Sequence, residues 1–284
     1  MTRRTMGALM VLAALVLAAP ASAQFVTTKD GPIVYGHHHL ASSNIEASSK
    51  FFATIGGVPG KFAGNNADIV KFPGVVIFFR AQAPTGGSKG TTADHLGLSV
   101  PNLRQTLDRL KAAGYRVVTA AEAPPAYKVE NEIAMPNATT KLAFVLGPDD
   151  VKVELLEAAQ QTDPAKLHHV HFFGQQNQAM RDWYVKVFGA KPRDTPNFLV
   201  GDLPGVALNF SAAAAPVAGT SGRAVDHVGF EIKDLEAFCK RLDEMGIKQT
   251  VAFRKVPNWG LAIAFITDPW GTSIELTEGL DSIR

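Results

Sequence analysis

Residues 37–40 read His-His-His-Leu, and residues 169–172 repeat this pattern as His-Val-His-Phe, 132 positions further along the chain. A second pair of segments has the same offset: Asp-His-Leu-Gly-Leu at residues 94–98 and Asp-His-Val-Gly-Phe at residues 226–230. From the first histidine of one segment to the histidine of the next is 58 positions in both halves. Equal offsets at two separate landmarks indicate that half of the chain is duplicated, and they predict a repetitive fold.

Each of the four segments opens a module with the same order of elements. A short strand comes first, followed by an amphipathic helix, a turn bounded by glycine, and strands rich in Val, Ile and Phe. In the second module, for example, Leu103, Leu107 and Leu110 share one face of the predicted helix. The order of elements in each module is therefore βαβββ.

The boundaries of these modules follow from composition. Loops at residues 83–92 and 211–223 are rich in small residues and proline, and a polar linker around residues 160–166 separates the two halves. A chain of 284 residues is long enough for two ordinary domains. We therefore predict an α+β fold with domains at residues 31–157 and 163–278, each built from two modules with curved mixed sheets.

Composition excludes several classes of protein. Hydrophobic residues make up 46% of the chain and charged residues 19%, as is usual for a globular protein and not for a disordered one. The formal net charge is only +2, and no basic run suggests a nucleic-acid partner. Because Cys239 is the single cysteine, no disulfide can form within the chain.

The first residues have the order of a signal peptide. Arg3 and Arg4 precede an apolar run at residues 8–19, and the small residues 21–23 come directly before Gln24. The apolar run has about 12 residues, whereas a membrane-spanning helix needs about 20. We therefore predict that residues 1–23 are removed on export, and that the mature protein is periplasmic or secreted without a membrane anchor.

All eight histidines lie in the opening strands of the predicted modules. Imidazoles at the same place in each repeat favour ligands to a divalent metal ion over histidines that serve solubility or packing. These residues are His37, His38, His39, His95, His168, His169, His171 and His227.

This arrangement resembles the vicinal-oxygen-chelate superfamily, which includes glyoxalase I, extradiol dioxygenases and bleomycin-resistance proteins. Its pattern opens with a histidine before an aromatic residue of the helix, and both His37 to Phe52 and His169 to Tyr184 span 15 positions. It closes with a glutamate after an Asp-Pro turn, as at residues 268–276, and residues 147–155 are a looser version. The resemblance covers nearly all of the predicted mature chain and implies two domains of this family.

The resemblance also implies two sets of metal ligands. If neighbouring modules pair, the sets are His37, His95 and Glu154, and His169, His227 and Glu275. The superfamily also pairs the first module with the fourth and the second with the third. That arrangement would give His37, His227 and Glu275 in one set, and His95, Glu154 and His169 in the other.

Two imidazoles and one carboxylate with open positions are the ligands used for Fe(II) and oxygen chemistry, so Fe(II) is favoured over Mn, Zn or Ni. A glyoxalase-like set would need a fourth ligand near Phe78 in the first module and near Asn209 in the third, and Phe78 cannot bind a metal. The sequence therefore favours dioxygenase-like over glyoxalase-like chemistry. Extradiol enzymes carry a further His and Tyr in a stretch that here, at residues 258–265, has neither, which argues against ring cleavage of catechols.

Two further histidines share a face with the predicted ligands. Residues two apart in a strand point the same way, so we expect His39 to lie on the same face as His37, and His171 on the same face as His169. We predict His39 and His171 as catalytic acid/base groups. The alternatives are that they line the pocket or serve as ligands themselves.

These observations predict an exported, divalent-metal-dependent enzyme that acts on a small oxygen-bearing molecule. A metal-free protein that only binds small molecules, as in the bleomycin-resistance branch, is the alternative. One half could also be catalytic and the other structural, in which case the regular ending at Glu275 favours the C-terminal half. The oligomeric state stays open, and a homodimer is compatible with the sequence.

The predicted leader can be tested directly. N-terminal sequencing of the protein purified from its host's exported fraction should begin at Gln24 or within a few residues of it. An uncleaved chain recovered from the cytosol would refute export.

Overall fold

The computed structural model describes residues 27–64 and 67–280. The predicted leader at residues 1–23 lies outside these ranges. The described chain forms two large sheets and five α-helices, which confirms the predicted α+β class. No helix in these ranges is long and apolar enough to span a membrane.

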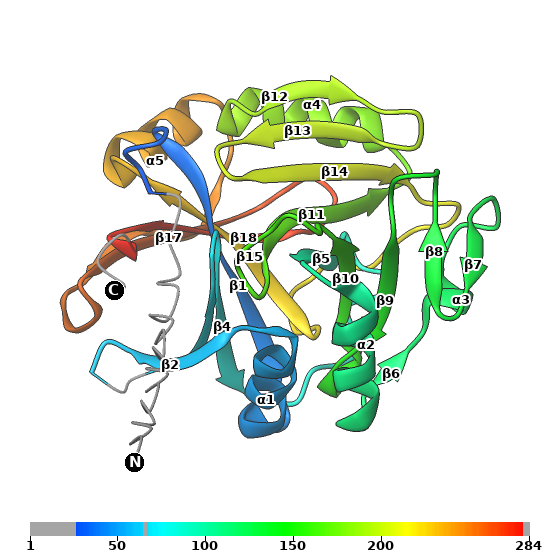
Figure 1. The fold of residues 1–284 in the computed structure, drawn as a ribbon. Coiled ribbons are helices and arrows are strands. Elements are labelled where there is room, and N and C mark those ends of the chain that lie inside the picture. The colour runs from blue at the N-terminus through cyan, green and yellow to red at the C-terminus, as the bar shows by residue number, and fades with distance from the viewer. Residues whose placement is uncertain (1–26, 65–66, 281–284) are drawn as a thin grey trace, which may run out of the picture.

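The strands are divided between two sheets that lie side by side (Figure 1). We call them the β1/β15 sheet and the β5/β11 sheet after their central strands. The β1/β15 sheet has the order β16 (Gln249–Val256), β17 (Leu261–Thr267), β18 (Ser273–Glu278), β15 (Val225–Ile232), β1 (Ile33–Ser42), β4 (Val75–Ala81), β3 (Ala67–Phe72) and β2 (Val58–Phe62). The β5/β11 sheet has the order β12 (Lys191–Asp194), β13 (Leu199–Leu203), β14 (Val206–Ala212), β11 (Lys166–Gly174), β5 (Ala93–Val100), β10 (Lys152–Glu157), β9 (Leu142–Leu146), β8 (Ile133–Met135) and β7 (Lys128–Glu130), with β6 (Arg116–Val117) paired to β9.

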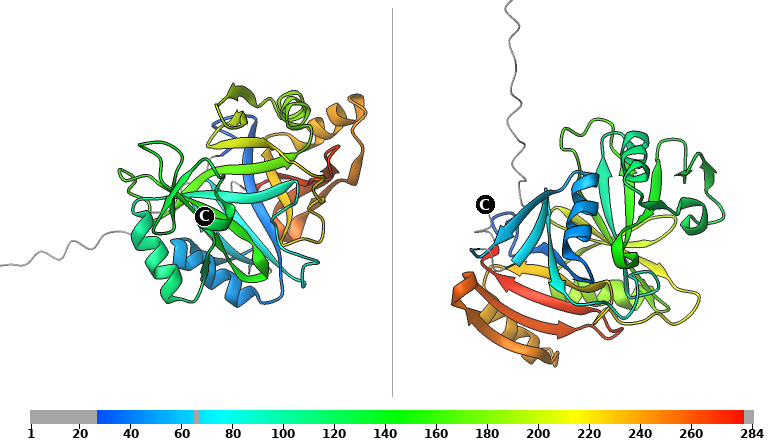
Figure 2. Two further views of the ribbon diagram at one scale, coloured as in Figure 1. Left: turned by 90° about the vertical axis from the view of Figure 1, so that its right-hand side faces the viewer. Right: turned by 90° about the horizontal axis from the view of Figure 1, so that it is seen from below.

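Four of the five helices lie in two pairs at opposite sides of the molecule, and each pair has one helix from each sheet's modules (Figures 1 and 2). Helix α1 (Ile45–Ile55) contacts α2 (Leu103–Ala112), while Phe188 of α4 (Asn177–Phe188) stacks on Phe238 of α5 (Leu235–Glu244). Short polar side chains begin three of the helices, as Asn44, Asn102 and Asp234 each accept a backbone hydrogen bond from the first turn. The fifth helix, α3 (Thr119–Glu122), belongs to neither pair.

Three of the four modules have the predicted order of elements. The first, third and fourth each contain one strand, one helix and three strands. The second module departs from it, because short strands β6, β7 and β8 and helix α3 lie between α2 and β9. Its last two strands, β9 and β10, still occupy the places expected of a βαβββ unit.

The two sheets do not follow the predicted boundaries at residues 31–157 and 163–278. Strand β1 pairs antiparallel with β15, and β5 pairs antiparallel with β11. Each sheet therefore takes one module from each of those ranges, the first with the fourth and the second with the third. The four opening strands present equivalent edges, so sequential and crossed pairing satisfy the backbone equally well, and the module pattern alone does not choose between them.

The two inter-module loops support this crossed arrangement by pairing with each other. Thr85 N–H donates to the carbonyl of Gly222, and Ala224 N–H donates to the carbonyl of Gly86. Further along, Thr92 N–H donates to the carbonyl of Ala218. Both chain crossings between the sheets thus lie at one place.

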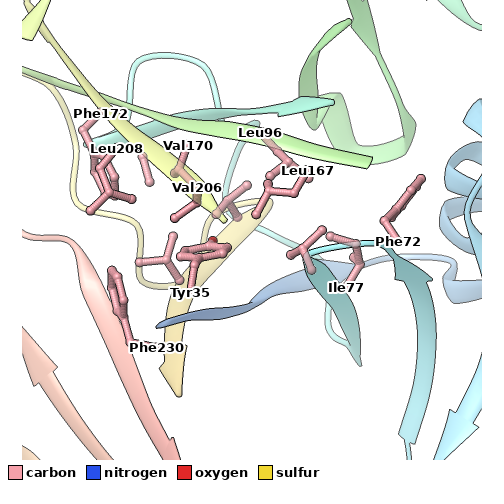
Figure 3. Close-up of a cluster of buried hydrophobic side chains, with 14 of the residues drawn as sticks. Tyr35, Phe72, Ile77, Leu96, Leu167, Val170, Phe172, Val206, Leu208 and Phe230 are labelled. Atoms are coloured by element: carbon pink, nitrogen blue, oxygen red, sulfur yellow. The ribbon is translucent and has the colours of Figure 1, made fainter. Parts of the chain in front are cut away.

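A shared apolar core joins the two sheets. Tyr35 and Phe230 from the β1/β15 sheet lie opposite Val170 and Leu208 from the β5/β11 sheet (Figure 3). All four side chains are almost fully buried, and burial of such residues stabilises a protein by about 1.5 to 3 kcal/mol each. Because the core occupies one face of each sheet, the polar strand residues must occupy the other.

An irregularity in the pairing of each central strand turns the histidines to that other face. The register of β1 shifts between Tyr35 and His37, and that of β11 shifts between Leu167 and His169. Residues two apart would otherwise share a face, but a β-bulge changes the alternation. Tyr35 and Leu167 therefore pack in the core, while His37 and His169 leave it.

Two candidate metal centres

The β1/β15 sheet brings four potential metal ligands together, which we call the β1/β15 cluster. His37 and His39 come from β1, His227 from β15 and Glu275 from β18, and one ligand atom of each lies within 4.8 Å of the others. Nε2 of His37 and Nε2 of His227 each lie 2.9 Å from Oε2 of Glu275. Neighbouring strands set this geometry, since His39 pairs with His227 in the sheet register.

The β5/β11 sheet contains an equivalent group, the β5/β11 cluster. His169 and His171 come from β11, His95 from β5 and Glu154 from β10, again with ligand atoms within 4.8 Å of one another. Oε2 of Glu154 lies 3.0 Å from Nε2 of His95 and 3.3 Å from Nε2 of His169. The duplication of the sequence has thus produced two sites with the same set of donors.

All six predicted ligands lie in these clusters, but the sets predicted from sequential pairing are wrong. His37 does not join His95 and Glu154, because β1 and β5 belong to different sheets. The crossed alternative is the one observed. His39 and His171, predicted as acid/base groups, lie among the ligand atoms themselves.

The remaining two histidines lie outside both clusters. His38 is buried on the core side of β1, where its Nδ1 contacts the hydroxyl of Tyr35. His168 is exposed at the register shift of β11, and its Nδ1 lies 2.9 Å from Nδ1 of His169. Their exclusion from the predicted site is consistent with these positions.

A buried aspartate orients one histidine of each cluster. Nδ1–H of His227 donates to Oδ1 of Asp226 over 2.7 Å, and His95 donates to Asp94 over the same distance. This contact leaves Nε2 facing the cluster and fixes the ring, as carboxylates commonly do for metal-bound histidines. Sequence reasoning missed both aspartates, although each directly precedes its histidine in the repeated Asp-His segments.

A nearby cation holds each of these aspartates. Nζ of the buried Lys152 lies 2.5 Å from Oδ1 of Asp94, while an Arg80 guanidinium nitrogen lies 3.1 Å from Oδ2 of Asp226. Burial opposes ionisation of Asp226, but its hydrogen bonds from His227 and Gly222 outweigh this effect and lower its pKa. The aspartate is therefore an anion that accepts from His227.

The ionisation of His39 and Glu275 suits metal binding. Burial, together with the nearby imidazoles of His227 and His37, lowers the pKa of His39 to about 3. Burial also opposes the charged form of Glu275, but hydrogen bonds from His227 and His37 lower its pKa well below the usual range. Burial opposes the charged form of His227, but its hydrogen bonds to Asp226 and Glu275 outweigh burial and raise its pKa. Neutral imidazoles and an ionised carboxylate are the forms that bind metal ions, so an ion at Nε2 of His227 would displace a proton.

Two glycines make room for the imidazole rings of His37 and His169. The imidazole of His37 lies over Gly229, and that of His169 lies over Gly97, so closely that a Cβ at either glycine would overlap the ring. Both glycines stand two positions after the histidine of a repeated Asp-His segment, a signal that was visible in the sequence. They act as cradles that position the rings.

The donor atoms fit a divalent ion. Among the described residues, His37 Nδ1, His169 Nε2 and His171 Nδ1 are buried and have no hydrogen-bond partner, and of these His169 Nε2 faces the carboxylate of its cluster, 3.3 Å from Oε2 of Glu154. An unpaired buried donor or acceptor is costly unless something satisfies it. Three imidazoles and one carboxylate suit Fe, Zn, Ni and Mn, and poorly suit Mg or Ca.

The residue expected nearest to a fourth, glyoxalase-like ligand is apolar in one cluster. Phe78 lies opposite His39 in the pairing of β4 with β1, and its ring contacts the edge of His37. In the β5/β11 cluster, Asn209 lies opposite His171 and is buried. Phe78 and Asn209, the residues expected nearest to a fourth ligand, thus each lie beside a histidine of a cluster.

The clusters differ in their surroundings. His37, His39 and Glu275 line a cavity of about 140 Å³. In the β5/β11 cluster all four residues are buried, and Nε2 of His171 lies 2.8 Å from the hydroxyl of Ser211. A small molecule thus has a place to bind beside the β1/β15 cluster.

Comparison with known proteins agrees with the fold. Residues 166–276 match the profile described as the Glyoxalase/Bleomycin resistance protein/Dioxygenase superfamily, which confirms the predicted resemblance. Glyoxalase I from Zea mays has a similar structure, with a TM-score of 0.64, 16% identity, and coverage of 88% of this chain and 94% of that one. A proposed dioxygenase from Bacillus subtilis subsp. subtilis str. 168 has a TM-score of 0.61 and 13% identity, over 87% of this chain and 85% of that one. No curated protein matches the sequence.

The glycine cradles provide a test of the clusters. Replacing Gly229 with Ala should displace the ring of His37 and weaken metal binding at the β1/β15 cluster by roughly 10- to 100-fold, as for other changes that misplace a ligand. Gly97→Ala should do the same at the β5/β11 cluster alone. The measurement is metal stoichiometry by elemental analysis during stepwise removal with a chelator.

The control is Gly60→Ala, because a Cβ at Gly60 meets only Ile69, at an ordinary 3.8 Å. This variant should bind metal like the native protein. If Gly229→Ala retains both ions with native affinity, the described position of His37 is not the one that binds metal.

Proposed function

We propose that this chain, whose residues 166–276 match the profile of the glyoxalase/bleomycin resistance protein/dioxygenase superfamily, is a divalent-metal enzyme acting on a small oxygen-bearing molecule. The reaction takes place at the β1/β15 cluster. The observation that carries the proposal is that three potential ligands, His37, His39 and Glu275, also line a cavity. A ligand in that cavity reaches the cluster directly.

A divalent ion bound there would supply a Lewis acid that binds two neighbouring oxygens of the substrate and stabilises negative charge on them. The protein's own residues supply position and environment. Asp226 fixes the ring of His227, and Gly229 seats that of His37. Phe78, beside both His37 and His39, excludes water from one side of the cluster.

His39 gives the site a hydrogen-bonding group for the substrate. Its imidazole is neutral, and a neutral imidazole has one unprotonated ring nitrogen that can bind an ion or accept a hydrogen bond from a substrate hydroxyl. His39 lies against His227, with ring centroids 4.6 Å apart, and lines the cavity. In our proposal it serves the substrate, while His37, His227 and Glu275 hold the metal.

The ligand set favours oxygenase-like over glyoxalase-like chemistry. Two imidazoles and one carboxylate leave positions open, whereas a fourth protein ligand at Phe78 is chemically excluded. Fe(II) is the ion we propose, with Mn, Zn or Ni as the other ions that this donor set can hold. The β5/β11 cluster, whose four residues are buried, serves as a structural metal site.

We also propose that the protein acts outside the cytoplasm. The support is the basic, apolar and small-residue order of residues 1–23. The N-terminal sequencing described above tests this part separately from the metal site.

Metal content tests the proposed function. The native protein should bind two ions per chain, and Glu275→Gln should lose the ion of the β1/β15 cluster, with a loss of affinity greater than the roughly 10- to 100-fold of changes beside a ligand. Glu154→Gln should lose only the other ion. The matched control is Glu278→Gln on the same strand, whose carboxylate accepts from Leu235 N–H outside the cluster, and it should keep both.

A spectroscopic probe then separates an open metal site from a closed one. Nitric oxide added to the Fe(II)-loaded protein should give the electron paramagnetic resonance signal of an iron nitrosyl in the native and Glu154→Gln proteins, and none in Glu275→Gln. Equal metal content in the native protein and in a variant lacking both glutamates would instead leave a metal-free binding protein as the function.

A further inference from the structure

The cavity beside the β1/β15 cluster restricts the size of its ligand. Its volume is about 140 Å³, and a protein cavity of about 150 Å³ lined by apolar residues holds one benzene molecule. Its lining residues include His37 and Glu275 of the cluster as well as Arg254 and Val256 of the edge strand β16. A body of about one ring therefore fits.

The walls of this cavity are largely apolar. Trp259, Leu261 and Ile263 line one side, and Phe78 lines the side nearest the metal ligands. Phe62 packs edge-on against both Trp259 and Phe78, so the aromatic walls are held in place from behind. Such a surface favours binding of an apolar or aromatic group and offers few hydrogen bonds to a sugar-like one.

One cation lines the same cavity. Arg254 is on β16 and pairs with Ile263 of β17, which in turn pairs with Thr277 of β18. It therefore lies two strands and two residues away from Glu275. Since strands are ~4.8 Å apart and residues rise ~3.3 Å, the Cα atoms of Arg254 and Glu275 are roughly 12 Å apart.

Arg254 has no anionic partner within the described part of the chain. None of the ion pairs or hydrogen bonds found there involves its guanidinium. The carboxylate that does line the cavity, Glu275, is occupied by His37 and His227. A guanidinium offers paired N–H donors that match a carboxylate in two parallel hydrogen bonds.

We propose that the substrate has three parts: two neighbouring oxygens at the metal ligands, a ring-sized apolar body between Phe78 and Trp259, and an anionic group, best a carboxylate, bound by Arg254. Arg254 is thus a specificity residue for an anionic substrate. This inference rests on the proposed function because the metal orients the substrate's oxygens. The charge selectivity belongs to Arg254 alone.

Two synthetic probes isolate that selectivity. In 4-carboxybenzohydroxamate, two neighbouring oxygens can bind a metal, a benzene ring fills the cavity, and a carboxylate lies at the far end. Its para-carboxamide analogue differs only in charge. We expect Arg254→Gln to weaken binding of the carboxylate probe to the metal-loaded protein roughly tenfold or more, since hydrogen bonds to charged groups are the strong ones. Binding of the amide should change less than about twofold.

The matched control is Lys255→Gln. Lys255 is the next residue of β16, carries the same charge and points to the other face of the strand. It should leave binding of both probes unchanged, as measured by isothermal titration calorimetry. An equal loss for both probes in Arg254→Gln, an equal effect of Lys255→Gln, or no binding of either probe to the native protein would overturn the proposal.

Repeating the titrations after metal removal separates the two claims. If the native chain binds no metal, the proposed function fails, yet a preference for the carboxylate probe that Arg254→Gln abolishes would still support the role of Arg254. If metal binds as proposed but Arg254→Gln keeps the native preference, only the substrate inference fails.

Discussion

The antiparallel pairing of the opening strands is the constraint on which the rest of this structure depends. It places His39 beside His227 on β1 and β15, and His171 beside His95 on β11 and β5. The parallel neighbours β18 and β10 then bring Glu275 and Glu154 within reach of those rings. Because each cluster draws on two modules, neither module can hold a metal alone, and any ion would bind the two halves of the chain together.

Much of this arrangement could be predicted from the sequence, because its signals are local and repeated. Histidines at equal offsets predicted the modules and placed His39 and His171 beside the expected ligands, and the family resemblance implied the six ligands, Glu154 and Glu275 among them. The pairing of modules could not be predicted, since β1, β5, β11 and β15 offer equivalent edges and the choice rests on how two loops cross. Asp226 and Gly229 stand close to His227 in the sequence, but their roles could not be inferred from it. Only the structure shows that the ring of His37 lies over Gly229.

The position of Arg254 on the cavity wall could not be predicted from the sequence pattern. The pairing of β16 with β17 has two register shifts before Arg254, and these decide which face of the edge strand it occupies. Each shift exchanges inward and outward side chains. A charged residue on an exposed strand is ordinarily a solvated one. Its place on the cavity wall depends on the register of β16, β17 and β18, and the residues around Arg254 in the sequence do not predict that register.

Duplication has produced two clusters with the same donors but different environments. Around the β5/β11 cluster, Phe144 and Phe173 contact the histidines, and the buried Lys152 holds Asp94 from behind. Around the β1/β15 cluster, Arg80 holds the equivalent Asp226 from a half-exposed position, and a cavity reaches the ligands. The same ligands can thus stabilise the fold in one sheet and serve a substrate in the other.

Anomalous diffraction from crystals grown with Mn²⁺ or Fe²⁺ tests this account most directly. We expect one ion in each sheet, bound by His37, His227 and Glu275 in one and by His95, His169 and Glu154 in the other. An absence of ions at both clusters, or ions bound only elsewhere, would contradict the account.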